Sequence, residues 1–172
     1  MLIDYTFFQG NILISGIVPP ATSPALTAYA INGDMDNYIA FYEREYLIKA
    51  LGENVYEQFS EYLKSDRSEP VEIWEELSNV LVVNIGDDCK VSPIANYIYF
   101  FYARSHQGEV SVNGVKKDSD VGDLISPIDK MVNAWNDMVK MNKRLYGWLK
   151  KQNIEGWEFE KPLLEPINVF NL

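Results

Sequence analysis

The chain has 172 residues, of which 47% are hydrophobic and 13% aromatic, so it is large and apolar enough to form one domain with its own core. Its 15 basic and 25 acidic residues give a net charge of −10, which argues against a surface that grips nucleic-acid phosphates. The single cysteine, Cys89, excludes a disulfide within the chain and fits a reducing, intracellular setting. We expect neither a signal peptide nor a membrane-spanning segment.

Residues 1–33 carry little helical periodicity, and three prolines interrupt them before residue 25. We predict an extended N-terminal arm over this range, in which residues 24–31 could form a short helical turn. An arm this apolar must cover either its own domain or a neighbouring subunit. Its apolar run supplies the first candidate interaction residues, which are Ile12, Leu13 and Ile14.

Residues 34–152 are predicted to form one helical bundle domain. The first helix should begin at Asp34, a favourable N-cap, and end at Leu51 before Gly52. Its apolar stripe turns Glu43, Arg44 and Glu45 away from the core. Shorter helices should begin at Asn54, where Glu57 completes a capping box, and at Pro70.

Two Ser-Pro pairs predict the starts of the main helices, because serine caps the helix and proline fits its first position. The pair at Ser92 opens a helix to about residue 107 that is apolar on most sides and therefore central. The pair at Ser126 opens a helix to about residue 152. The β-branched residues between 80 and 91, with a turn signal at Gly86, indicate a short strand or hairpin.

The loop 108–125 holds an Asn-Gly pair between two valines, a strong signal for a β-hairpin. We predict a short, exposed hairpin insertion there and an extended C-terminal strap over residues 153–172. The overall fold class is therefore mainly α, a bundle of about four to five helices with extended terminal arms. The hairpin supplies the other candidate interaction residues, which are Val112, Asn113, Gly114, Val115, Lys116 and Lys117.

Catalytic chemistry has little support in the sequence. His106 and Cys89 are the sole histidine and cysteine, too few for a zinc site and a poor basis for a nucleophilic triad. A calcium-loop spacing that includes Asp34 and Glu43 has Asn37 where the loop needs glycine. Paired acids are better explained as exposed helix faces. We therefore predict no enzyme activity, no catalytic residue, no metal and no cofactor.

Several segments together resemble a known family. They are Tyr38-Ile39-x-x-Tyr42-Glu43, Tyr46-Leu47-x-x-Ala50-Leu51-Gly52, Tyr56-x-x-Phe59, Trp74-x-x-Leu77, Ser92-Pro93-Ile94-Ala95-Asn96-Tyr97-Ile98-Tyr99, and Ser126-Pro127 with Ala134-Trp135-Asn136-x-Met138-Val139. Over about residues 34–150 the chain resembles small proteins of phages and prophages of Bacteroides-type bacteria. Those proteins are similar to the head–tail connector, or adaptor, proteins of tailed phages.

The resemblance implies a mostly helical subunit of a homo-oligomeric ring in the virion, assembled in the host cytoplasm. Such a ring binds portal and tail proteins and carries the DNA channel without reading a DNA sequence or touching a membrane. Two other functions stay open. One is an acidic regulatory module that binds a basic partner, and the other is a metal-dependent hydrolase that uses clustered acids.

Overall fold

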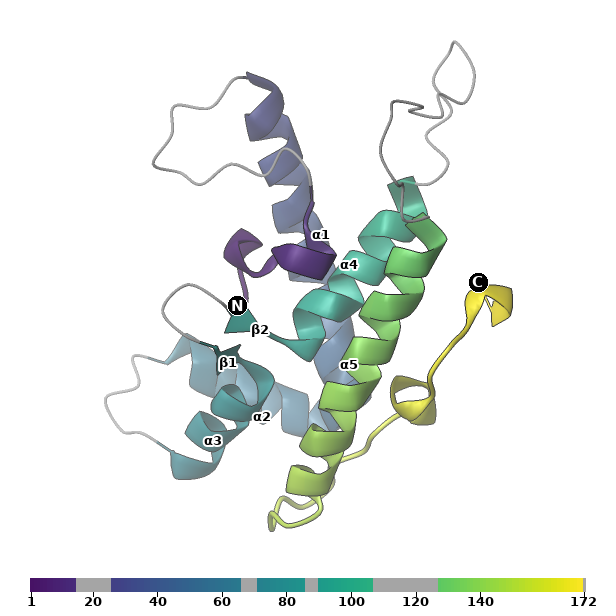
Figure 1. Cartoon of the computed structure of the whole chain (residues 1–172). Coiled ribbons are helices and arrows are strands. Elements are labelled where there is room, and N and C mark those ends of the chain that lie inside the picture. Colours follow the sequence, from purple (N-terminus) through teal and green to yellow (C-terminus); the bar gives the residue numbers. More distant parts are fainter. Residues whose placement is uncertain (15–25, 66–70, 86–89, 107–126, 172) are drawn as a thin grey trace.

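The computed structural model describes residues 1–14, 26–65, 71–85, 90–106 and 127–171. Over these residues the chain is mainly helical, which confirms the predicted fold class (Figure 1). The five α-helices are α1 (Leu26–Leu51), α2 (Glu53–Lys64), α3 (Glu72–Leu81), α4 (Pro93–His106) and α5 (Pro127–Leu149). In this part of the chain, no helix is both long enough and apolar enough to cross a membrane.

The central helix is α4, which packs against α1 on one side and α5 on the other (Figure 1). Every residue from Pro93 to Phe100 is buried, as its nearly continuous apolar surface predicts. Ser92 caps this helix, because its Oγ accepts a hydrogen bond from the Ile94 N–H at 3.2 Å. The predicted start at Ser92 is confirmed, whereas Ser126 lies outside the described residues.

The first long helix differs from its prediction. It begins at Leu26, so Asp34 lies inside α1 and the predicted N-cap is wrong. Residues 26–32 contain no proline, and one interior glycine, Gly33, costs only about 1 kcal/mol in a helix. The predicted end at Leu51 is confirmed. Gly52 follows with φ of +80°, a conformation that favours glycine.

The capping box predicted for the next helix is also absent. That helix, α2, begins at Glu53, and Gly52 occupies its N-cap position without any side-chain hydrogen bond. Beyond α3, a two-stranded antiparallel hairpin joins β1 (Val83–Asn84) and β2 (Lys90–Val91), with Val83 opposite Val91. It confirms the short hairpin predicted between residues 80 and 91. The hairpin predicted at 108–125 lies outside the described residues.

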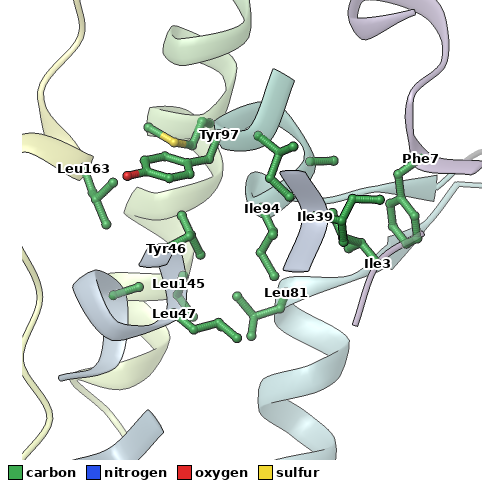
Figure 2. Packing of buried hydrophobic residues seen from close by; sticks show 14 of the residues in the cluster. Ile3, Phe7, Ile39, Tyr46, Leu47, Leu81, Ile94, Tyr97, Leu145 and Leu163 are labelled. Atoms are coloured by element: carbon green, nitrogen blue, oxygen red, sulfur yellow. The ribbon is translucent and has the colours of Figure 1, made fainter. Parts of the chain in front are cut away.

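The N-terminal residues pack on the bundle. Two short 3-10 helices, η1 (Tyr5–Phe7) and η2 (Gly10–Ile12), bury Phe7 and Ile12. Figure 2 shows Ile3 and Phe7 beside Ile39 of α1, at one end of the hydrophobic core. Residues 1–14 therefore cover their own domain, which is the first of the two alternatives that the sequence left open, and they include two 3-10 helices where an extended arm was predicted.

The C-terminal strap also packs on its own bundle. Backbone N–H groups of Glu158 and Glu160 donate to the carbonyl oxygens of Leu51 and Lys49, at 3.1 and 2.8 Å. Further along, η3 (Lys161–Leu164) buries Leu163 against the bundle, and η4 (Val169–Asn171) follows near the C-terminus. The strap then runs along α5, as the yellow segment of Figure 1 shows.

Candidate functional site

The residues predicted to contact partners differ in their exposure to solvent. Ile12 and Ile14 are buried in the chain's own core, whereas Leu13 between them is 60% exposed. Of these three, Leu13 therefore presents the apolar surface that a partner could cover. The second predicted region, residues 112–117, lies outside the described residues and stays a prediction.

Glu43 holds the N-terminal segment on α1, although the helical pattern predicted that it faces away. Its carboxylate is buried and accepts hydrogen bonds from the N–H of Leu2 at 3.0 and 3.1 Å and of Ile3 at 3.2 Å. Burial raises the pKa of the Glu43 carboxyl, and the two backbone donors oppose part of that rise. The prediction is wrong because η1 and its flanking residues cover this side of α1.

A second polar cluster links α1 to α4. The Tyr97 hydroxyl donates to Glu45 at 2.9 Å and accepts from the Lys49 ammonium at 3.1 Å, and Lys49 pairs with Glu45 at 2.8 Å. Burial raises the pKa of the Tyr97 hydroxyl. Burial would lower the pKa of Lys49, but hydrogen bonds to Glu45 and Tyr97 outweigh it and raise that pKa. Both groups keep their protons at neutral pH, which suits a cross-link between helices better than proton transfer.

Aromatic rings connect the three long helices. Tyr42 of α1 stacks on Phe101 of α4 with ring centroids 4.8 Å apart. Tyr97 of α4 then contacts Tyr46 of α1 at 5.5 Å and Trp135 of α5 at 6.1 Å. We call these five residues the aromatic network. Such ring pairs add stability beyond the area that they bury.

The outer face of α1 carries a shallow groove of about 540 Å³. Phe41 borders it, 64% exposed, and its ring meets that of Tyr42 nearly at a right angle with the centroids 5.0 Å apart. A large aromatic ring this exposed is a common feature of protein interfaces. We call this surface the α1 groove, and it is formed by Asn37, Ala40, Phe41, Arg44, Glu45, Ile48, Lys49 and Glu160.

Helices α2 and α3 carry many exposed acidic side chains. Helices α2 and α3 pack together through Phe59 and Trp74, whose rings are 5.7 Å apart. Their exposed sides carry glutamates, with Lys64 as the basic residue of the pair. We call this surface the acidic face, and it comprises Glu53, Glu57, Glu61, Glu72, Glu75 and Glu76.

The described residues contain no candidate metal site, because no three acidic, histidine or cysteine side chains among them lie close enough together to hold an ion. The calcium-loop spacing considered for Asp34 and Glu43 falls within the helix α1, not in a loop. Glu43 moreover uses its carboxylate to hold the backbone of Leu2 and Ile3.

Sequence reasoning missed two buried asparagines. Asn142 of α5 accepts from the Tyr46 hydroxyl and donates to the carbonyl oxygen of Leu163 at 2.8 Å, so it joins α1, α5 and the strap. Asn96 of α4 donates to the carbonyl oxygen of Ala134 at 3.0 Å. The available signal was their position on the apolar faces of two helices, because a polar residue there needs a buried partner.

In comparisons with protein-family models, with curated proteins and with solved structures, nothing matched this chain. Its function is therefore inferred from its own residues, from the surfaces described above and from the resemblance carried by its sequence motifs.

Proposed function

We propose that this chain is a structural subunit of a phage head–tail connector ring, which links portal to tail proteins around the DNA channel. The observation that carries the proposal is where the family-like motifs lie. The motif residues Tyr42, Tyr46, Tyr97 and Trp135 come from three helices and belong to one aromatic network. The segments that resemble connector proteins thus build one common core.

The α1 groove supports the proposal with a surface for a neighbouring subunit. A ring of identical subunits uses two different patches of each copy, one of which receives the other. Phe41 lies on the outer face of α1, away from the covered N-terminal side, and can enter a neighbour's surface. Aromatic anchors of this kind supply much of the binding energy at interfaces.

The charge of the chain supports the same role. A channel that DNA must traverse should not bind the phosphate backbone, and binding rises with the number of basic contacts. The net charge of −10 keeps such contacts few.

Electron microscopy of the full chain with the portal protein encoded by the same genome tests the proposal. We expect rings from the wild-type chain and from Ile85→Ser, which removes a 57% exposed side chain outside the α1 groove. We expect Phe41→Ser to reduce ring formation strongly. A wild-type chain that stays monomeric beside its portal protein would contradict the proposal.

The acidic face favours a second candidate, a regulatory module that occupies the basic surface of a partner. Six exposed glutamates on α2 and α3 would complement such a surface and speed its association. Affinity capture from host lysate separates the candidates. Recovery of one basic host protein, lost when Glu72, Glu75 and Glu76 are changed to glutamine, would support the module and oppose the ring.

A further inference from the structure

A pocket of about 570 Å³ lies between η2, β2 and the C-terminal half of α5, apart from both surfaces described above. It brings together segments that are far apart in the sequence. Apolar side chains of Phe7, Ile12, Val91 and Met141 form part of its wall. This mixture of an apolar wall with a few polar groups is typical of small-molecule sites.

The charge of the pocket opposes that of the molecule. Lys90, Lys140 and Arg144 line it together with one acid, Asp137, whereas the chain as a whole has 15 basic and 25 acidic residues. Asp137 accepts from Lys140 at 2.8 Å. Lys90 and Arg144 form no ion pair within the described part of the chain, and the Lys90 ammonium lies 5.5 Å from the ring centroid of Phe7. Among the residues that the structure describes, two cations of the pocket are therefore left without a carboxylate.

A buried acceptor completes the pocket. Asn96 lines it and is only 7% exposed. Its Nδ2 donates to Ala134, which fixes the orientation of the amide, while its Oδ1 accepts no hydrogen bond from any described residue. A buried amide oxygen without a donor is uncommon in folded proteins. A hydroxyl group in the pocket would supply the missing donor.

We propose that this pocket binds a small organic anion that carries a hydroxyl group on a carbon atom, namely a phosphate monoester with a free hydroxyl or a hydroxycarboxylate. The Arg144 guanidinium and the Lys90 ammonium hold the anionic oxygens, because charge-assisted hydrogen bonds to such oxygens are strong. Asn96 Oδ1 accepts from the hydroxyl of the ligand, and the apolar wall receives its carbon atoms. The proposal does not depend on the ring.

Nuclear magnetic resonance of the full ¹⁵N-labelled chain tests whether the pocket binds such an anion, through the side-chain signals of Asn96 and Arg144. The probes are inorganic phosphate, glycolate and acetate at one ionic strength; acetate has no hydroxyl. We expect saturable shifts with phosphate or glycolate, and binding of acetate weaker by about tenfold, the size of one good hydrogen bond. Binding of phosphate without glycolate would identify a phosphate group as the anion, and binding of glycolate without phosphate would identify a hydroxycarboxylate.

Variants on α5 make the test specific. Arg144→Gln, an exposed position, should weaken binding by about tenfold or more, and Lys90→Gln should act in the same direction. Lys143→Gln is the matched control, since Lys143 is exposed on the same helix but does not line the pocket. Absence of saturable shifts with both phosphate and glycolate, saturable binding of acetate as tight as that of glycolate, or unchanged binding by Arg144→Gln would each overturn the proposal.

Discussion

Gly52 illustrates how one residue sets the junction between α1, α2 and the C-terminal strap. It has φ of +80°, and a Cβ built there would lie 3.2 Å from the backbone nitrogen of Glu158. We expect Gly52→Ala to lower the free energy of unfolding by about 1–2 kcal/mol or more, because it adds backbone strain to a tight contact. Urea titration followed by circular dichroism measures this change.

Gly147 provides the matched control for that substitution. It lies inside α5, and beyond the local backbone of that helix nothing described would come within 4 Å of an added Cβ. Gly147→Ala should raise the free energy of unfolding by about 0.5–1 kcal/mol, since alanine loses less backbone entropy in a helix. Equal effects of the two substitutions would contradict the role assigned to Gly52.

Glu43 predicts a pH dependence of stability. Burial raises the pKa of its carboxyl above the ordinary value of 4.5, so the folded state binds this proton more tightly than the unfolded state. Its contribution is therefore fully present below pH 4.5 and is lost as the pH rises through the folded pKa. Glu43→Gln stays neutral and can still accept from Leu2 and Ile3, so we expect it to remove this decline.

Urea titrations over a series of pH values check the Glu43 prediction. Glu57→Gln, which changes an exposed glutamate of α2, should keep a pH dependence close to that of the wild type. A Glu43→Gln chain whose stability still falls with the wild-type slope would show that another group causes the decline.

At the scale of elements, the strap depends on one apolar anchor. Leu163 is 1% exposed, and its carbonyl oxygen accepts from the buried Asn142. We expect Leu163→Ala to lower the free energy of unfolding by about 2–5 kcal/mol and to open residues 153–171 to proteases. The adjacent Leu164 is less buried, so Leu164→Ala should have a smaller effect. Equal losses would mean that Leu163 does not anchor the strap.

The elements that local pattern alone determines were predictable. The end of α1 before Gly52 and the start of α4 at Ser92 follow from backbone conformation and from one capping hydrogen bond. The start of α1 could not be predicted in this way, because Asp34 can stand either at an N-cap or inside a helix next to Gly33. The observed start depends on residues 26–32, which form a helix although their apolar residues show only weak helical periodicity.

The terminal segments show why tertiary contacts escape sequence reasoning. An apolar run such as Ile12 to Ile14 predicts a covered surface but does not say which chain covers it. The docking of Ile3 on α1 depends on Glu43, forty residues away along the chain. No local signal connects two such positions, and the same holds for the candidate pocket between Lys90 and Arg144.

At the scale of the whole molecule, the two candidate functions predict opposite responses to salt. Copies that each carry a net charge of −10 repel one another, and salt screens that repulsion over about 10 Å at 0.1 M ionic strength. Ring formation by this chain should therefore strengthen as salt rises from low levels. Capture of a basic partner by the acidic face should weaken. Sedimentation velocity at several salt concentrations measures both.

The aromatic network also gives the bundle an intrinsic fluorescence signal. Tyr97 lies 6.1 Å from Trp135, and Phe100 brings a further ring to within 4.8 Å of the same indole. Light absorbed by tyrosine at such separations passes to tryptophan by resonance transfer. Emission excited through tyrosine therefore reports the docking of α5 on α4 together with that of the strap, whose Trp157 lies 5.6 Å from Tyr146, without any dye attached to the chain.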